Sequence, residues 1–223
     1  MGDPAAKDEL FDAFADVAKA LGNGRRAELV DVLAQGERHV DELATEIRQS
    51  VANTSFHLRT LAAAGLVQTR KEGTRVHYRL ASDRVGDLWA ALRDVGAAHR
   101  AELDDLATAY LGDRRELESI SRAELQDRMR AGHVVLVDVR PRAEFESGHI
   151  TGARSIPIDE FPDALEGLPP GREIVAYCRG PYCAFADDAV RLAAARGRRA
   201  RRLDDGYPEW RSAGLPVERP PSA

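Results

Sequence analysis

Six consecutive residues, Cys178 to Cys183, contain both cysteines of this 223-residue chain. The preceding residues, 173–177, are rich in β-branched and aromatic types and predict a strand. The apolar spacing from Ala184 to Gly197 predicts a helix after them. Cys178 is therefore expected where a strand ends, in a tight loop above a helix N-terminus. Free amides and the helix dipole stabilise an anion there, so this order predicts a reactive Cys178 thiolate.

The loop backbone is expected to hold the sulfur anion. The amides that can converge on the Cys178 sulfur are those of Arg179, Gly180, Tyr182, Cys183 and Ala184. Pro181 has no N–H and restricts the turn. The alternative is that both cysteines are small, inert, buried residues. Glycine and proline inside the loop favour the reactive interpretation, because they specify backbone geometry.

Length and composition limit the class of protein. The chain is long enough for one large or two ordinary domains, and its 43% hydrophobic and 31% charged residues are typical of a soluble folded protein. No apolar run is long enough to span a bilayer, and the first residues carry acid where a signal peptide carries base. Two neighbouring cysteines do not make a secreted disulfide framework. We expect a cytoplasmic protein, with no membrane partner and with thiols reduced at rest.

The charge distribution indicates a nucleic-acid partner, although the net charge is −5. Residues 48–79 contain six basic side chains and one acidic one, Glu72, in a half that is acidic elsewhere. A basic stripe on an acidic body is typical of a confined DNA contact. The alternative is a solvated face of mixed charge.

The sequence pattern of the first half predicts helices followed by one hairpin. We expect helices at 8–21, 25–35, 40–47 and 51–64, strands at 66–70 and 75–80 around a turn at 71–74, and a long helix at 83–111. Short helix, turn, helix and basic hairpin is the order of a winged helix-turn-helix. Residues 1–112 are therefore expected to form an all-α domain with a β-wing.

Several motifs in this half resemble the ArsR family of bacterial repressors. They lie at 20–21, 40–44, 55–58, 61–67 and 72–80. The resemblance covers roughly residues 10 to 110. It implies a homodimer whose outer helices pack together and whose fourth helices enter successive major grooves of double-stranded DNA at an inverted-repeat operator.

The predicted fourth helix carries the candidate DNA contacts. Leu58, Leu61 and Val51 are expected to face the core, and Asn53 is a candidate for reading adenine. The candidate phosphate contacts are Ser50, Thr54, Arg59, Arg70, Lys71 and Arg75. His57 is either a base contact or the donor of a structural hydrogen bond within the helix.

The ArsR resemblance also raises the question of a metal sensor, since many members bind metals through cysteines or histidines. The region 37–41 has no cysteine, and the last helix has His99 as its one histidine. A zinc or arsenic site needs three or four convergent ligands. We expect no metal and no other cofactor.

The sequence pattern of the second half predicts a separate domain. After a linker at 113–118, the capping box from Ser121 to Glu124 starts a helix, and residues 134–139 form a continuous apolar run suited to a buried strand. Two such strands with helices between them imply an α/β domain with a small parallel sheet over 119–218, followed by a tail at 219–223. Open sheets of this kind bind ligands at the carboxyl ends of their strands, where Cys178 is expected.

This half resembles rhodanese domains. The matching motifs lie at 138–140, 144–145, 148–153, 206–210 and 214–217. The resemblance implies that Cys178 accepts sulfur from a small donor such as thiosulfate or polysulfide. It also implies bracing roles near the loop for Asp138, Arg140, Glu144 and His149, and a core position for Trp210.

Loop length separates this chemistry from phosphoryl transfer. A cysteine phosphatase or arsenate reductase needs an arginine six positions after the cysteine to clamp the oxyanion, and that position is Ala184. Arg179 either attracts an anionic sulfur donor or is a solvated surface charge. Cys183 could attack a Cys178 persulfide and release sulfide, provided that the two Cα atoms lie within about 7 Å.

Two hypotheses follow. In the first, the protein is an ArsR-type transcriptional regulator whose rhodanese domain senses sulfane sulfur or oxidant through Cys178. In the second, it is a rhodanese-type sulfurtransferase whose N-terminal half serves dimerisation or location. The basic wing favours the first, and a loop suited to turnover favours the second.

Overall fold

The computed structural model describes residues 2–219, which form two compact units. The first unit ends at Ala91 and the second begins at Leu92, so helix α5 (Asp83–His99) passes from one to the other. The domain boundary expected from the sequence lies later, at residue 112. Of the expected tail at 219–223, only residue 219 lies within the described part of the chain.

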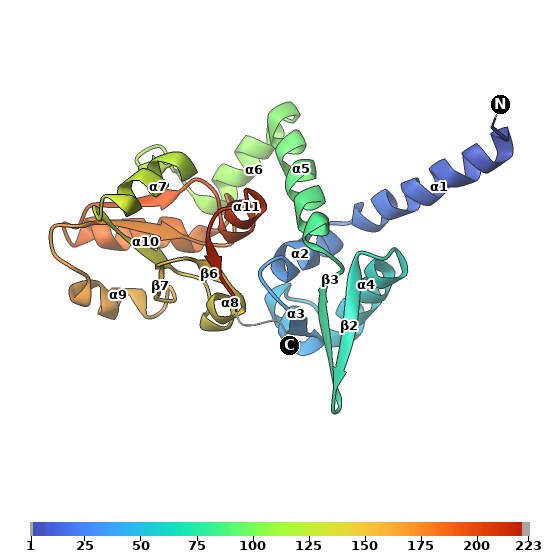
Figure 1. Cartoon of the computed structure of the whole chain (residues 1–223), viewed down its shortest axis with the longest axis horizontal. Helices are drawn as coiled ribbons and strands as arrows, with labels where there is room; N and C mark the ends of the chain where they lie inside the picture. Colours follow the sequence, from blue (N-terminus) through green and yellow to red (C-terminus); the bar gives the residue numbers. More distant parts are fainter. Residues whose placement is uncertain (1, 220–223) are drawn as a thin grey trace. The chain divides into compact units, whose positions relative to one another are not determined.

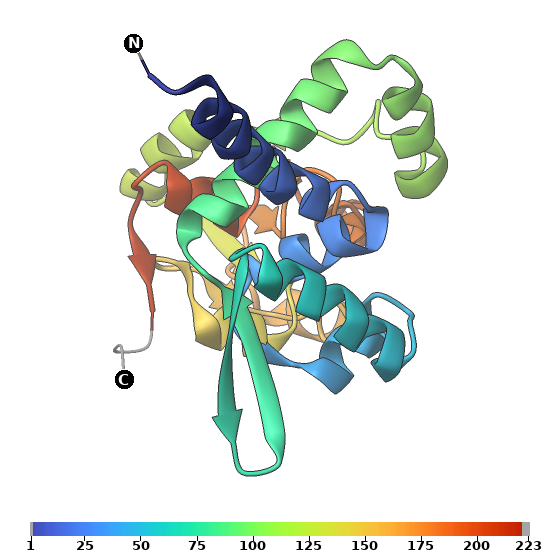
Figure 2. The same cartoon turned by 90° about the vertical axis from the view of Figure 1, so that its right-hand side faces the viewer.

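The first unit has the winged helix-turn-helix order, as predicted. Its elements are α1 (Pro4–Leu21), α2 (Gly24–Leu33), β1 (Arg38–His39), α3 (Val40–Glu46), α4 (Val51–Ala63), β2 (Val67–Glu72) and β3 (Arg75–Leu80). Local chemistry sets the helix starts: the Asn23 side chain accepts hydrogen bonds from the amides of Arg25 and Arg26, and Ser50 accepts one from Asn53. Figure 2 shows the β2–β3 hairpin extending beside α4.

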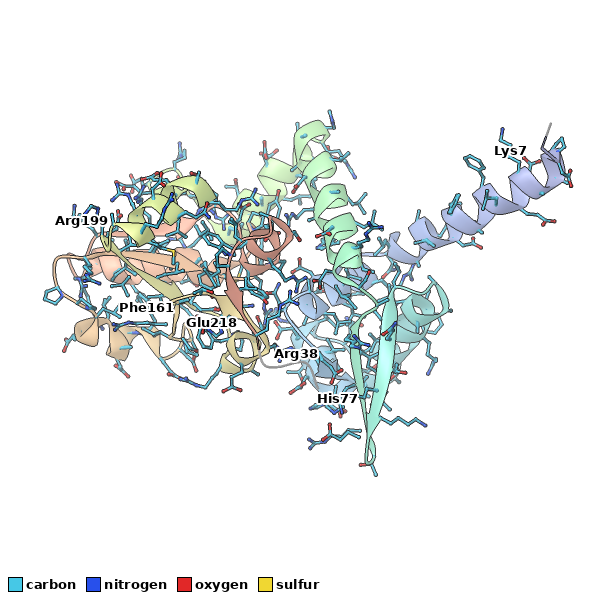
Figure 3. The ribbon with its side chains drawn as sticks, viewed as in Figure 1. Lys7, Arg38, His77, Phe161, Arg199 and Glu218 are labelled. Atoms are coloured by element: carbon cyan, nitrogen blue, oxygen red, sulfur yellow. A yellow bond between two sulfur atoms is a disulfide. The ribbon has the colours of Figure 1, made fainter. Side chains whose placement is uncertain are left out.

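The antiparallel sheet of this unit has one strand more than predicted. Its order is β1-β3-β2, and Arg38 of β1 pairs with Tyr78 of β3, next to His77 (Figure 3). The hairpin strands extend to Glu72 and restart at Arg75, which leaves a two-residue turn with Gly73 at a positive φ of 59°. The short β1 lacks the alternation by which strands are recognised in a sequence.

The predicted long helix at 83–111 is wrong in one respect, because it is two helices. After α5 the chain turns at Arg100 and Ala101, and α6 (Glu102–Leu111) folds back, as Figure 1 shows. A Cβ at Gly96 would lie 3.2 Å from the Cδ1 atom of Leu103. The missing side chain at Gly96 therefore lets Leu103 approach α5, a tertiary contact that apolar spacing does not reveal.

The second unit is an α/β domain around a parallel sheet, which confirms the predicted fold class. The strand order is β4 (Ser119–Ile120), β9 (Ala200–Leu203), β8 (Glu173–Tyr177), β5 (Val134–Asp138) and β7 (Arg154–Ser155), and every neighbouring pair is parallel. A separate antiparallel pair joins β6 (His149–Ile150) to β10 (Val217–Glu218).

Two cores sandwich this sheet. Val135, Val137, Ile174 and Ala176 belong to one core, and the alternate residues of the same strands belong to the other. The first core includes residues of α9 (Phe161–Ala164; Figure 3) and α10 (Ala184–Ala195), and the second includes residues of α7 (Arg122–Arg130) and α11 (Tyr207–Ser212). The remaining elements are α8 (Arg142–Ser147) and a 3-10 turn, η1 (Leu165–Gly167).

Within residues 2–219, no helix combines the length and the apolar character needed to cross a membrane.

Candidate functional site

The cysteine loop lies where the sequence places it. Strand β8 ends at Tyr177, Cys178 follows at the carboxyl end of the strand, and Cys183 is the N-cap residue directly before α10. Cys178 is buried in the sheet core, and its carbonyl accepts a hydrogen bond from the Tyr207 amide at 3.1 Å. The arrangement puts Cys178 at the position where α/β sheets present their reactive groups.

The two sulfurs are bonded to one another. Cys178 and Cys183 form a disulfide with their Cα atoms 6.2 Å apart. The sequence analysis expected both thiols to be reduced at rest, whereas the structure shows the oxidised loop. In this form the Cys183 amide donates to the Gly180 carbonyl at 3.2 Å, so one of the five amides expected to face the Cys178 sulfur is engaged by the loop itself.

Arg179 is turned into the protein. Its guanidinium pairs with the carboxylate of Glu144 at 2.6 Å, and Glu144, on α8, is fully buried. The Arg179 guanidinium carbon also lies 5.9 Å from the centroid of the Phe185 ring. Arg179 is therefore not a solvated surface charge, one of the two roles considered for it, whereas Tyr182 in the same loop is exposed.

A buried ion pair supports the neighbouring strand end. Asp138 and Arg140 are both fully buried; Arg140 Nε lies 2.9 Å from Asp138 Oδ1, and Arg140 Nη2 donates to the Gly148 carbonyl at 2.8 Å. Burial alone lowers the pKa of Arg140, but the hydrogen bonds and charge of Asp138 raise it above its usual value. The Arg140 guanidinium carbon lies 4.5 Å from the Tyr207 ring centroid. These contacts brace the turn between β5 and α8, next to the strand that ends at the cysteine loop.

Three further side chains support this region. Burial raises the pKa of Tyr177 well above its usual value, and its hydroxyl accepts a hydrogen bond from the Ile150 amide at 3.1 Å. His149 stacks on Phe145 at 3.6 Å between ring centroids. Trp210 is buried, and its indole N–H donates to the Pro216 carbonyl at 3.0 Å.

Gly206 has a role that sequence reasoning did not assign. A Cβ at this position would lie 2.3 Å from the Gly180 nitrogen and 2.4 Å from the Arg179 carbonyl carbon, so no side chain fits. Glu209 accepts a hydrogen bond from the Gly206 amide at 3.0 Å and pairs with Arg93 at 2.9 Å. Glycine at the start of α11, where a side-chain cap is usual, was the signal available in the sequence.

Arg114 is a second residue that the sequence analysis missed. Its guanidinium donates to the Pro181 carbonyl at 2.7 Å and forms an ion pair with the buried carboxylate of Asp187 on α10. Sequence separations of 67 and 73 residues leave no local signal for these contacts.

The exposed side of α4 and the wing carry most of the predicted DNA contacts. Ser50, Asn53, Arg59, Arg70, Lys71 and Arg75 are exposed. The Asn53 side-chain amide donates to Gln49 at 2.7 Å, and Arg70 pairs with Glu37 at 2.6 Å and with Glu72 at 2.8 Å. Lys71 and Arg75 flank the hairpin turn.

Two of the predicted contacts need correction because their side chains face the core. Thr54 is fully buried and His57 is nearly so, in line with Leu58 and Leu61 on the helix period, whereas Val51 is exposed. Burial, followed by the charges of Arg26 and Arg25, lowers the pKa of His57. We therefore no longer count Thr54 and His57 among the candidate DNA contacts.

In the described part of the chain, no group of three or more histidine, cysteine, aspartate or glutamate residues is arranged to hold a metal ion.

Two protein families match separate parts of the chain. Residues 23–69 match the arsR family of bacterial regulatory proteins, and residues 121–213 match the rhodanese-like domain. The first match covers α2 to α4 with the start of β2, and the second includes the whole cysteine loop.

Similar proteins are known for the whole chain and for each half. The HTH-type transcriptional regulator Rv0324 of Mycobacterium tuberculosis is 48% identical over 217 residues, which are 97% of this chain and 95% of the relative. A sulfurtransferase of Allochromatium vinosum is 32% identical over 87 residues, 39% of this chain and 80% of that protein. The homodimeric winged helix-turn-helix DNA-binding domain Mb0332 of Mycobacterium bovis is 41% identical, with a TM-score of 0.43, and the match covers 46% of this chain and 94% of that one.

Proposed function

The chain belongs to the arsR family of bacterial transcriptional regulators and carries a rhodanese-like domain, and from this premise we propose that sulfur chemistry at Cys178 controls its binding to operator DNA. The observation that carries the proposal is the cysteine loop. Both thiols of the protein lie in it, at the carboxyl end of β8, and they are close enough to form a disulfide. A signal that acts on thiols must therefore begin in this loop.

The first step that we propose is sulfur transfer to Cys178. The Cys178 thiolate attacks the outer sulfur of thiosulfate, a new S–S bond forms, and sulfite leaves with the electron pair of the bond that breaks. A polysulfide donor reacts in the same way and leaves one sulfur shorter. The loop amides and the N-terminus of α10 favour the anionic reactant and the anionic persulfide product.

The second step uses Cys183. Its sulfur attacks the Cys178 sulfur of the persulfide, the terminal S–S bond breaks, and hydrosulfide leaves with the bonding pair and the proton of the Cys183 thiol. The products are one hydrosulfide ion and the Cys178–Cys183 disulfide, so no separate oxidant is needed. The 6.2 Å separation of the Cα atoms supports this step.

DNA binding is assigned to α4 and the wing. Ser50, Asn53 and Arg59 lie on the exposed side of α4, and Lys71, Arg70 and Arg75 lie on the hairpin, where they can contact phosphates while Asn53 reads a base. Two copies would bind an inverted repeat with half-sites roughly 34 Å apart. We propose a cytoplasmic homodimer, supported by the exposed apolar side chains Leu10, Phe11 and Phe14 of α1 and Leu88, Leu92 and Val95 of α5.

Helix α5 is the proposed route of coupling, since it belongs to both units. Within the first unit, the Trp89 indole donates to Asp31 at 2.8 Å. One turn later, within the second unit, Arg93 pairs with Glu209, the residue that also holds the Gly206 amide. A change in the cysteine loop that shifted Glu209 would act directly on this helix. A ligand shifts such an equilibrium only by its differential affinity for the two states.

Sulfurtransferase activity is the second candidate function. It is favoured by the intact loop and by the similarity to a sulfurtransferase over 87 residues. A transferase passes the sulfur from Cys178 to an external acceptor and turns over many times. A sensor retains it or forms the disulfide.

A DNA titration of the full chain tests the proposal. The duplex is one selected from a random library by the reduced protein, and the titration is repeated after thiosulfate or polysulfide treatment. We expect the donor to weaken binding by about 5- to 150-fold, the usual range of allosteric coupling. Cys178→Ser should abolish the effect and Cys183→Ser should change its extent or reversibility.

The result also separates the two functions. Equal affinities for the reduced, persulfidated and disulfide forms would show that the two halves act independently. Multiple turnovers with cyanide as the acceptor would then identify the transferase.

A further inference from the structure

Arg114 lies in the segment between α6 and β4, outside the residues 121–213 that match the rhodanese-like domain. It nevertheless contacts the cysteine loop and α10, within the second unit of the chain. Arg191 of α10 also binds this part of the chain. Its Nη2 atom donates hydrogen bonds at 3.3 Å to the carbonyl oxygens of both Leu111 and Asp113. The segment is thus bound to α10 at several points.

The first contact of Arg114 fixes a peptide of the loop. Its Nη1 atom donates to the Pro181 carbonyl at 2.7 Å, a charge-assisted hydrogen bond. That carbonyl and the Tyr182 N–H belong to one planar peptide unit and point in opposite directions. By holding the carbonyl, Arg114 therefore fixes the direction of an amide that is a candidate donor to the Cys178 sulfur.

The second contact neutralises a charge. Asp187 lies in the first turn of α10 with its side chain fully buried, and Arg114 forms an ion pair with it. A negative group in the first turn occupies the same helix end that is expected to stabilise the sulfur anion. Another cation, Arg202, lies 3.6 Å from Asp187, so Arg114 is one of two arginines whose charges offset this carboxylate.

We propose that Arg114 is a positioning residue for sulfur transfer, which orients the Pro181–Tyr182 peptide and neutralises Asp187 beside the anion at Cys178. The proposal rests on the proposed function of Cys178 as the sulfur acceptor. Arg114 acts through the loop and does not touch the donor. The rhodanese-like reaction of this chain is thus completed by a residue from the segment that follows the DNA-binding half.

The test compares two adjacent arginines in the reduced 223-residue chain. Arg114→Gln removes both contacts, whereas Arg115→Gln is the matched control, because the Arg115 side chain is 89% exposed and pairs only locally with Asp113. Persulfide formation at Cys178 is followed by rapid quench and mass spectrometry over a range of thiosulfate concentrations. Three quantities are measured: the rate constant at saturation, the half-saturating concentration and the final amplitude.

We expect Arg114→Gln to lower the saturating rate constant by about 10-fold or more, the size of one lost charge-assisted hydrogen bond. The half-saturating concentration should stay within about twofold, and Arg115→Gln should match the unaltered protein. A purely structural role would reduce the amplitude, which counts folded molecules, and leave the rate constant of the folded fraction unchanged. That outcome, or equal rate constants for the two variants, would overturn the proposal.

Arg114→Lys keeps the test decisive if Arg114→Gln does not fold. A lysine keeps a charge near Asp187. Its compact ammonium does not reproduce the paired contacts that the planar guanidinium makes with the Pro181 carbonyl and the Asp187 carboxylate. We expect an intermediate rate constant, and a rate equal to that of the unaltered protein would contradict the proposal. If the unaltered protein forms no persulfide at Cys178, the proposed function of Cys178 as the sulfur acceptor is wrong. If it forms the persulfide and Arg114→Gln does so at the same rate, only the proposed role of Arg114 is wrong.

Discussion

The two units present their candidate functional residues in opposite ways. Around Cys178, the charged groups are buried and paired with one another: Arg140 with Asp138, and Arg179 with Glu144. On α4 and the wing, the basic side chains are exposed, and those beside the hairpin turn reach into solvent. The first arrangement fixes a single loop geometry before any ligand arrives. The second leaves each side chain to adapt to a DNA backbone.

The two regions are therefore expected to respond differently to substitution. In the second unit, one altered group leaves an unpaired buried partner or a clash, so the effects on folding are large and shared. In the first unit, each exposed cation contributes separately, so the effects on binding are small and additive.

The largest effect is expected for Asp138→Asn. The change removes the Asp138 charge and its hydrogen bonds to the fully buried Arg140 guanidinium, which costs about 3–5 kcal/mol of unfolding free energy. Urea unfolding of the full chain measures the loss. The matched control is Asp127→Asn, which removes an exposed ion pair with Arg130 and should cost no more than about 1 kcal/mol. Equal losses for the two variants would remove the contrast between buried and exposed pairs.

The next effect is expected for Gly206→Ala. The added methyl group meets the backbone of Gly180 and Arg179, which cannot retreat like a flexible side chain, so about 1–3 kcal/mol is lost together with sulfur uptake. Gly167→Ala is the control, since a Cβ there would meet no atom within 4 Å. Denaturation and mass spectrometry check both variants, and a Gly206→Ala protein with ordinary stability and uptake would disprove the close packing.

Smaller, separable effects are expected for the wing. Lys71→Ala and Arg75→Ala should each weaken binding uniformly across duplex sequences and reduce the slope of log affinity against log salt by about 0.9 for each lost phosphate contact. Lys7→Ala on α1 is the control (Figure 3). Filter binding or anisotropy at several salt concentrations gives the slopes. Unchanged slopes would place the DNA contacts elsewhere.

The smallest effect concerns His57 and pH. Because burial, Arg26 and Arg25 lower its pKa, the unfolded chain binds a proton near pH 6.5 while the folded chain does not. Stability is therefore lost as the pH falls below about 6.5. His57→Gln should flatten this part of the stability profile, measured by urea unfolding at pH 7.5 and 5.5, while His99→Gln should not. A profile identical to that of the unaltered protein would show that the pKa of His57 is the same in the folded and the unfolded chain.

Local sequence patterns were sufficient for the main helices and the hairpin of the first unit, and for α7, β5, β8 and α10 of the second. Caps such as Asn23 and Ser50 and the apolar run of β5 act over a few residues, so their outcome is visible in the sequence. The break after α5 was not visible, because it depends on Leu103 packing at Gly96. On α4, the helix period was set slightly wrong: Val51 was placed inward and Thr54 outward, and the structure shows the reverse.

The candidate sulfur site also has features that were predictable from the sequence and features that were not. Strand, cysteine loop and helix follow one another in the sequence, so the position of Cys178 was predictable. The bond between the two thiols, the close approach of Gly206 and the contacts of Arg114 are three-dimensional outcomes. The latter two join residues that are distant in the chain, and no periodicity or motif in one sequence reports them.

The position of Arg114 has a consequence for the history of such a fusion. Domain shuffling is usually pictured as the exchange of modules at connecting segments that contribute nothing to either side. Here the connecting segment holds the Pro181 carbonyl and the Asp187 carboxylate, so a recombination event between Arg114 and Ser119 would detach the reactive loop from one of its supports. The segment from Arg114 onward is therefore a functional part of the rhodanese-like half, although it lies outside the residues that match that family.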